Sequence, residues 1–144
     1  MYKIFLDTNI LLDYLIIQRT GNSSAQRIME LIVEDKLTGY TSPISLLNIF
    51  FILRKQRTEQ ERKDIIESFL EILEIIDLDF DTLQMGLYIP VSDYEDAIQY
   101  MSAAKANVDY IITGDQQFQN YDLELKRIGA AEFLTVYDQG QGNS

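Results

Sequence analysis

The chain of 144 residues contains no cysteine, no histidine and no tryptophan. Without cysteine it forms no disulfide and offers no thiolate, a composition that fits a reducing compartment. Without cysteine or histidine it cannot build an ordinary zinc site, a histidine general base or a Ser-His-Asp triad. Any metal ion must therefore be bound by oxygen ligands, which favours magnesium, manganese or calcium.

Basic residues are scarce as well. Lysine and arginine together number 12, against 23 aspartates and glutamates, so the formal net charge is −11. This excess of negative charge argues against a protein that binds nucleic acid through a broad basic face. It is compatible with an enzyme that handles nucleic acid briefly at a metal site.

Long apolar runs are also missing. Asp7 and Asp13 interrupt the apolar opening segment, and no run approaches the roughly 18 residues that span a bilayer. With 47% hydrophobic and 24% charged residues, the chain can still build a substantial core. We expect a cytoplasmic protein with one domain over residues 1–138, no contact with a membrane and a disordered tail over 139–144.

Short apolar runs alternate along the chain with segments of helical periodicity. Strands are predicted at 2–6, 38–41, 74–78, 109–113 and 133–137. Helices are predicted at 9–18, 22–35, 43–56, from Thr58 onward, at 82–88 and at 92–106. Strands separated by helices are typical of parallel βαβ units, so the expected fold is a three-layer α/β/α sandwich with a central parallel sheet. Ligands of such sheets bind beyond the carboxyl ends of the strands.

Acidic residues stand where that rule predicts a site. Asp7 follows the first strand, and Asp115 comes just after the strand that ends at Thr113. Alone, each would be an ordinary N-cap or turn aspartate. Asp93 and Asp96 share one face of the first turn of a helix, where acids also suit the helix dipole. Carboxylates brought together repel one another unless they share a divalent cation, and a water activated by such a cation can hydrolyse a phosphodiester.

Asn48 lies in the middle of residues 44–53, a helical segment that is otherwise nearly all apolar. Such a helix is largely buried, so the amide needs a hydrogen-bond partner inside the protein. Two interpretations are open. Asn48 is either a satisfied core asparagine or a residue that reaches the same polar centre as the aspartates.

Four segments together closely resemble the PIN domain: LDTN after the first strand, SPISLLNIFFILRK, SDYEDAIQYMSAAKA and DYIITGD. This family consists of metal-dependent ribonucleases, many of them VapC-type toxins of bacterial toxin–antitoxin pairs. The resemblance covers about residues 2–137 in the expected order. It implies a PIN-like fold and an endoribonuclease that uses Mg²⁺ or Mn²⁺ to activate the water that attacks RNA. It also implies an antitoxin protein as a partner and a homodimer.

The resemblance assigns roles to individual residues. Asp7, Asp96 and Asp115 match the catalytic, metal-binding acids of the family. The supporting residues that it implies, which orient those acids and the water or lie at the edge of the site, are Asn9, Thr113 and Asp93.

The chain departs from the family at Asn48, where a glutamate is common. An amide oxygen can still bind a hard cation, but it brings no charge and cannot act as a base. The departure leaves open a site with one metal ion, slow hydrolysis, or hydrolysis that has been lost.

An RNA substrate also calls for positive charge. The candidates are Arg54, Lys55 and Arg57 at the end of the apolar helix, followed by Lys105. These residues can equally serve as favourable charges at helix C-termini.

Two other functional classes remain. The first is a catalytically impaired PIN-like protein that acts by binding a basic, antitoxin-like partner, for which the acidic charge and the apolar faces over 10–17 and 69–76 are suited. Those faces can equally be ordinary core. The second is a phosphoacceptor signalling domain, which usually has an acidic pair after its first strand and a lysine after a late one. Here one acid follows the first strand and Thr113 with Gly114 ends the late strand, which argues against it.

Overall fold

A parallel sheet of five strands forms the centre of the molecule in the computed structural model, which describes residues 1–142. The strands are β1 (Tyr2–Leu6), β2 (Leu37–Thr41), β3 (Glu74–Ile75), β4 (Tyr110–Ile112) and β5 (Arg127–Ile128). Their order across the sheet is β3-β2-β1-β4-β5, and every neighbouring pair is parallel. β1 therefore lies at the centre of the sheet, with β2 and β4 paired along its two edges.

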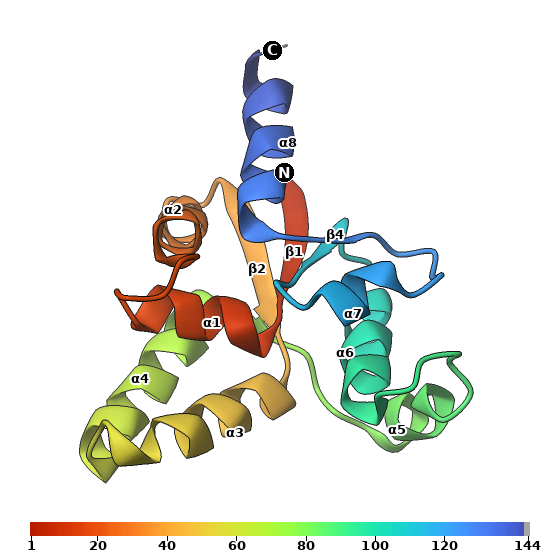
Figure 1. Ribbon diagram of the computed structural model, residues 1–144, viewed down its shortest axis with the longest axis horizontal. Helices are drawn as coiled ribbons and strands as arrows, with labels where there is room; N and C mark the ends of the chain where they lie inside the picture. Colours follow the sequence, from red (N-terminus) through yellow and green to blue (C-terminus); the bar gives the residue numbers. More distant parts are fainter. Residues whose placement is uncertain (143–144) are drawn as a thin grey trace.

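Helices pack against both faces of this sheet. The helices of the described residues are α1 (Thr8–Leu15), α2 (Asn22–Val33), α3 (Pro43–Ile52), α4 (Glu59–Ile72), α5 (Phe80–Gly86), α6 (Tyr94–Lys105), α7 (Gln116–Asn120) and α8 (Ala130–Gly142), with a 3-10 turn η1 (Leu53–Lys55) after α3. Of these, α5 packs on α6, and α4 packs on α3. Figure 1 shows α1 and α2 on one side of the strands and α6 and α7 on the other. The predicted three-layer α/β/α sandwich with a central parallel sheet is confirmed.

The two faces of β1 contribute to two separate hydrophobic cores. Ile4 and Leu6 belong to the core that includes side chains of α1, α2 and α8. Phe5 belongs to the other core, together with side chains of α6 and α7. Successive side chains of a strand point to opposite faces, and a central parallel strand is buried on both. The uninterrupted apolar run before Asp7 thus follows from the central position of β1.

Capping residues begin the helices that start at the carboxyl ends of the strands. The backbone N–H groups of the first turn of a helix have no partner within the helix. In each case a side-chain oxygen accepts a hydrogen bond from one of them. The capping residues are Asp7 for α1, Ser42 for α3, Asp93 for α6 and Asp115 for α7. Local sequence chemistry therefore fixes where each of these helices begins, and it brings acids to this edge of the sheet.

The prediction of a strand at 133–137 is wrong. These residues lie inside α8, and the fifth strand is the two-residue β5 that precedes it. Phe133, Leu134 and Tyr137 are buried, and their spacing places them on one face of a helix against the core that contains Ile4. The predicted domain boundary at 138 falls within the same helix, and residues 139–142 continue it where a disordered tail was expected. The rest of that predicted tail lies outside the described residues.

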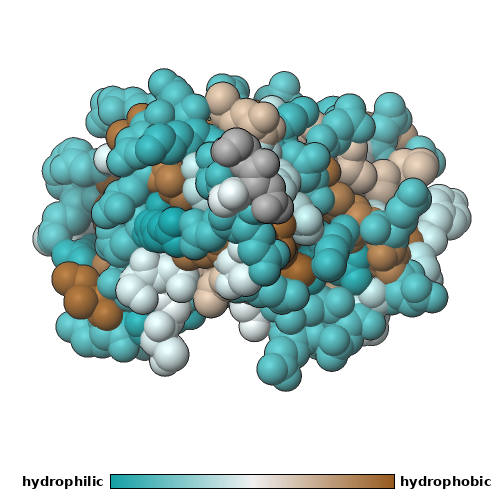
Figure 2. Space-filling view, turned by 90° about the horizontal axis from the view of Figure 1, so that it is seen from above, coloured by the Kyte–Doolittle hydropathy of each residue, from teal (hydrophilic) through white to brown (hydrophobic). Residues whose placement is uncertain are grey.

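The surface agrees with the acidic composition. Seen from the side of α8, most of it is hydrophilic, with separate small apolar areas (Figure 2). None of the helices described over residues 1–142 has the length and apolar character that would be needed to cross a membrane.

Candidate functional site

Asp7 lies at the carboxyl end of β1 and is held by four hydrogen-bond donors. Thr8 N donates to its Oδ1 at 2.8 Å and Gln99 Nε2 to the same oxygen at 3.2 Å. Thr113 Oγ1 donates to Oδ2 at 2.8 Å, and Asn9 Nδ2 donates to Oδ2 at 3.2 Å. The side chains come from α1, α6 and the end of β4, so Asp7 ties three elements together in one defined orientation.

Asp115 lies beside Asp7 because β4 pairs with β1 in parallel. The backbone N–H of Asp115 donates to Thr113 Oγ1 at 3.1 Å, so one hydroxyl contacts both aspartates. Asp115 Oδ1 accepts from Gln117 N at 2.9 Å and from Phe118 N at 3.4 Å, as the N-cap of α7. Among residues 1–142, the donors reach only Oδ1, which leaves Oδ2 for another ligand.

Asp96 is the acid of the site whose negative charge is least compensated by its surroundings. The residue is only 8% exposed, and its Oδ2 is buried without a hydrogen-bond partner among the described residues. Burial, and after it the negative charges of Asp93, Asp115, Asp7 and Glu95, together raise the pKa of the Asp96 carboxyl to about 7. The carboxylates from β1, β4 and α6 are therefore electrostatically coupled in a place that is short of positive charge.

Asn48 reaches this centre from α3. Its Nδ2 donates to Glu95 Oε1 at 2.5 Å and to Thr8 Oγ1 at 3.4 Å. The side chain is half-buried and faces the first turns of α6 and α1, where Asp96 and Asp7 lie. Of the two interpretations of Asn48, this contact pattern favours a residue of the polar centre over a core asparagine.

A buried polar network that sequence analysis missed supports the acids. Gln99 is 1% exposed, and its Nε2 donates to Ser45 Oγ at 2.7 Å as well as to Asp7. Its Oε1 accepts from the hydroxyl of Ser42, and Thr8 Oγ1 donates to Ser45 Oγ at 3.1 Å. The available signal was a glutamine three residues after Asp96, on the inward face of α6. The network locks α1, α3 and α6 against each other behind Asp7.

The donor chemistry suits a hard divalent cation, although the acids do not form a closed set of ligands. Within residues 1–142, no three acidic side chains stand close enough to bind one metal ion as they are placed. Carboxylates repel one another, and those of Asp7 and Asp115 are turned toward hydrogen-bond donors. The unpartnered, buried Oδ2 of Asp96 amid further carboxylates is what a Mg²⁺ or Mn²⁺ ion would compensate.

Two of the four candidate RNA-binding residues form ion pairs with acidic side chains. Arg57 lies 3.7 Å from Glu61, and Lys105 lies 2.8 Å from Asp79. These side chains must give up an ion pair before they can contact a phosphate.

The other two candidates end the apolar helix, in η1. Arg54 packs its guanidinium 3.7 Å from the ring centre of Phe51 and donates to the carbonyl of that residue. Figure 1 shows α3 beginning near α1 and running away from the strands. Arg54 and Lys55 come after the end of α3, so they lie farther from the strands than Asn48 does.

A groove opens beside Asp115. It has a volume of about 590 Å³, and its lining includes Asn9, Asp115, Asp13 and Arg19. The Arg19 side chain donates from Nε to Asp13 Oδ1 at 2.6 Å. Sequence analysis missed Arg19, which brings a guanidinium to the carboxyl edge of the sheet.

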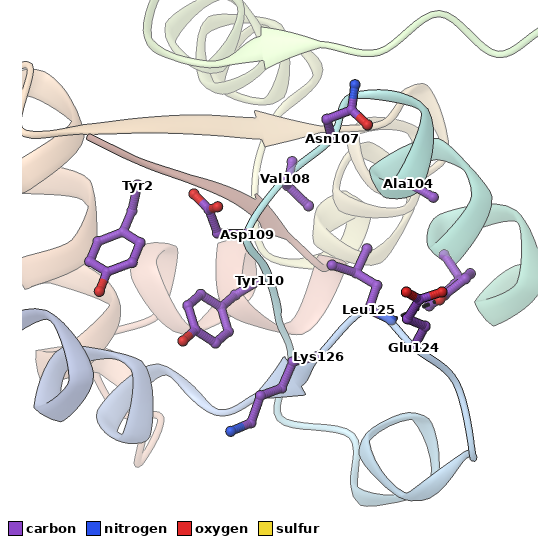
Figure 3. Close-up of a pocket in the computed structure, with 10 residues that line it drawn as sticks. Tyr2, Ala104, Asn107, Val108, Asp109, Tyr110, Glu124, Leu125 and Lys126 are labelled. Carbon is purple, nitrogen blue, oxygen red and sulfur yellow. Dashed lines mark hydrogen bonds between the residues drawn. The ribbon is translucent and has the colours of Figure 1, made fainter.

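A second hollow of about 620 Å³ lies at the opposite, amino end of β1 and β4 (Figure 3). Its lining includes Tyr2, Tyr110, Asp109 and Lys126. It holds none of the predicted site residues.

Comparisons with known proteins agree with the geometry. A family model described as PIN domain matches residues 3–117. A curated relative, Ribonuclease VapC1 of Aquifex aeolicus, is 24% identical over 128 residues, which cover 85% of this chain and 88% of the relative.

Similar solved structures include VapBC2 from Rickettsia felis bound to a DNA fragment from its promoter, with a TM-score of 0.66 and 18% identity over 88% of this chain and 96% of that one. They also include VapC20 of Mycobacterium tuberculosis, a Sarcin-Ricin loop cleaving toxin, with a TM-score of 0.64 and 15% identity over 80% of this chain and 92% of that one. At these identities the structural matches establish the fold.

Proposed function

This chain belongs to the PIN domain family, and we propose that it is a metal-dependent endoribonuclease that hydrolyses RNA phosphodiester bonds as the toxin of a toxin–antitoxin pair. The observation that carries the proposal is the buried Asp96 oxygen without a hydrogen-bond partner among the described residues, at the carboxyl edge of the sheet, where the negative charges of Asp7 and Asp115 also act on it. The name of the curated relative, a ribonuclease, supports the same reaction.

Asp7, Asp96 and Asp115 are the residues that would hold Mg²⁺ or Mn²⁺. When bound there, the cation supplies an activated water and neutralises charge that builds up on the phosphate. Thr113 keeps Asp7 and Asp115 in register, because its hydroxyl donates to one and accepts from the backbone of the other. Asn9 adds a second clamp, since its Nδ2 donates to Asp7 while its Oδ1 accepts from Gly114 N at 2.8 Å.

Asp93 acts through the helix on which Asp96 lies. Its Oδ1 accepts from Asp96 N at 3.2 Å, which fixes the first turn of α6 and thereby the direction of the Asp96 side chain. For the RNA backbone we propose Arg54 and Lys55 as phosphate contacts, with Arg57 and Lys105 recruited when their ion pairs open.

The test is cleavage of a mixed RNA pool by the purified chain in Mg²⁺ or Mn²⁺, with EDTA and Asp7→Asn as negative controls. Asp122→Asn is the matched control, because Asp122 is an exposed acid in the loop between α7 and β5. Cleavage that requires metal, is lost in Asp7→Asn and persists in Asp122→Asn supports the proposal. Cleavage that Asp7→Asn leaves intact overturns the proposed site, because it must come from elsewhere or from a contaminant.

We also propose an antitoxin-like protein partner and a homodimer. The apolar faces over 10–17 and 69–76 could dock a partner or belong to the core, and Ile10, Leu11 and Phe69 are core residues. An apolar groove of about 370 Å³ lies between α3 and α4, and exposed Leu47 and Leu70 line it. Because the similar structures include VapBC2 from Rickettsia felis, a partner that covers this groove is in keeping with the family.

The catalytically impaired alternative is a distinct outcome of the same assay. It rests on Asn48, which brings no charge to the site. A wild-type chain that cleaves no RNA in either metal, but still binds a basic partner, would favour that alternative over hydrolysis.

A further inference from the structure

The neutral amide on α3 faces an acid on α6. Asn48 Nδ2 donates to Glu95 Oε1 at 2.5 Å, although the two residues lie 47 positions apart in the chain. The same amide nitrogen lies 3.4 Å from Thr8 Oγ1, on the residue next to Asp7. The hydrogen bond therefore holds the Glu95 carboxylate in the space between α6, α3 and the start of α1.

Glu95 has a carboxylate oxygen available to bind a cation, whereas the nearby Asp93 caps a helix. Asp93 accepts the backbone N–H of Asp96 and is committed to capping α6. Within residues 1–142 the one hydrogen bond to the Glu95 side chain goes to Oε1, which leaves Oε2 available. The negative charge of Glu95 is the smallest of the four that raise the pKa of Asp96, so the exposed Glu95 carboxylate lies near enough to repel that of Asp96.

A second observation points to a ligand at this place. Asp96 is more than nine-tenths buried, and its Oδ2 has no hydrogen-bond partner among the described residues. An unpaired carboxylate oxygen in a buried position is costly unless a cation or a donor completes it. Adding Glu95 to its surroundings makes the need for a cation greater.

We propose that Glu95 is the fourth acid of the metal centre and that Asn48 is the residue that positions it. This inference rests on the proposed function. The negative charge that a glutamate on α3 would bring is delivered here from α6, one residue before Asp96. The pair is chemically matched, because an amide N–H can donate to Glu95 whereas a carboxylate at position 48 would repel it at the same distance. Asn48 and Glu95 thus work as a unit, and Asn48 need not signify a disabled site.

The test measures Mn²⁺ binding by the full chain without RNA, by the loss of the free Mn²⁺ signal in electron paramagnetic resonance. We expect Glu95→Gln to weaken binding about tenfold and Asn48→Ala to weaken it severalfold, as for residues that orient or supplement metal ligands. Glu132→Gln is the matched control, since Glu132 lies in the first turn of α8 as Glu95 lies in the first turn of α6. Its binding should equal that of the wild type.

The exchange Asn48→Glu/Glu95→Gln separates a metal-site role from a structural one. It returns the carboxylate to α3 and leaves an amide on α6, so we expect Mn²⁺ binding within about threefold of the wild type, well above that of Glu95→Gln alone. A purely structural role for the Asn48–Glu95 contact gives no such recovery in metal binding and overturns the inference.

Glu95→Gln with wild-type Mn²⁺ binding, alongside Asp96→Asn with none, also overturns the inference while leaving the proposed nuclease site standing. Wild-type binding in Asp7→Asn and Asp96→Asn as well contradicts the proposed metal centre itself. Absence of Mn²⁺ binding by the wild type contradicts both.

Discussion

The two ends of the parallel sheet carry hollows of similar size, but the acids near them differ in whether they have hydrogen-bond partners. The groove at the carboxyl end measures about 590 Å³ and that at the amino end about 620 Å³. At the amino end, Asp109 accepts the backbone N–H of Lys3 at 2.8 Å, and Lys3 Nζ donates to a carbonyl at 2.7 Å. At the carboxyl end, Asp96 keeps a buried oxygen without a partner among the described residues. Uncompensated charge, and not the size of a hollow, distinguishes the candidate site.

This asymmetry follows from the βα connection. Each strand of a parallel sheet leads at its carboxyl end into the N-terminus of a helix, where aspartate is a favoured cap and the helix dipole favours negative charge. Asp7 and Asp115 are caps of this kind, after β1 and β4. Because those strands are neighbours in the sheet, two ordinary caps become a pair of acids at one site.

The largest expected difference between the two ends concerns RNA cleavage. Asp7→Asn should lower the metal-dependent cleavage rate about a hundredfold or more, because it removes a charge that would hold the cation. Asp109→Asn, at the amino end, should change it less than about twofold. Rates from labelled RNA under single-turnover conditions measure both. Equal decreases in the two variants would show that the two ends do not differ in function.

Binding of RNA should respond less strongly. In the Asp7→Asn background, removing the charges of Arg54 and Lys55 should weaken RNA binding severalfold. It should also lower the slope of the salt dependence by about one unit for each phosphate interaction that is removed. Lys126→Gln removes one charge at the amino end and should leave both quantities unchanged. Fluorescence anisotropy over a range of salt concentrations gives the slopes, and a larger effect of Lys126 would move the RNA path to the other end.

Thermal stability offers a test without any substrate. In EDTA, Asp96→Asn should raise the Tm by about 3 °C, because it removes a buried, unpaired charge worth on the order of 1 kcal/mol. The same variant should lose the Tm increase that Mg²⁺ or Mn²⁺ gives the wild type. Differential scanning fluorimetry measures both effects, with Asp122→Asn as the control. A lower Tm for Asp96→Asn in EDTA would mean that its carboxylate has a stabilising partner.

The smallest effects concern pH, where two acids should behave in opposite ways. The pKa of Asp96 is raised to about 7, so the folded metal-free chain binds this proton more tightly than the unfolded chain and loses stability as pH rises from about 4 to 7. The pKa of Asp79 is lowered from its usual value of 3.8, chiefly by Lys105, so its contribution is present above that value and is lost as pH falls. Urea unfolding measured across pH should show the first slope removed by Asp96→Asn. The second slope should be reduced by Lys105→Gln, because the hydrogen bonds from Thr82 to Asp79 remain.

The sequence was sufficient where a structural feature depends on neighbours along the chain. The apolar run of β1 followed by Asp7, and the start of α3 at Pro43, lie at the positions that the local pattern predicts. The same local reasoning failed at 133–137, because a short apolar run fits a strand as well as one face of a helix. Packing of Phe133 against the core decided for the helix.

What the sequence by itself determined is the order of most strands and helices, the residues that cap them, and hence which acids stand at strand ends. Only the tertiary structure decided which of those acids meet and what balances them. It placed Gln99 behind Asp7 and set Asn48 against Glu95, across 92 and 47 positions of the chain. The physical reason is that a hydrogen bond between distant residues depends on how helices pack against a sheet. Local propensity does not determine that packing, whereas the hydrogen bond of a helix cap forms within a single helical turn.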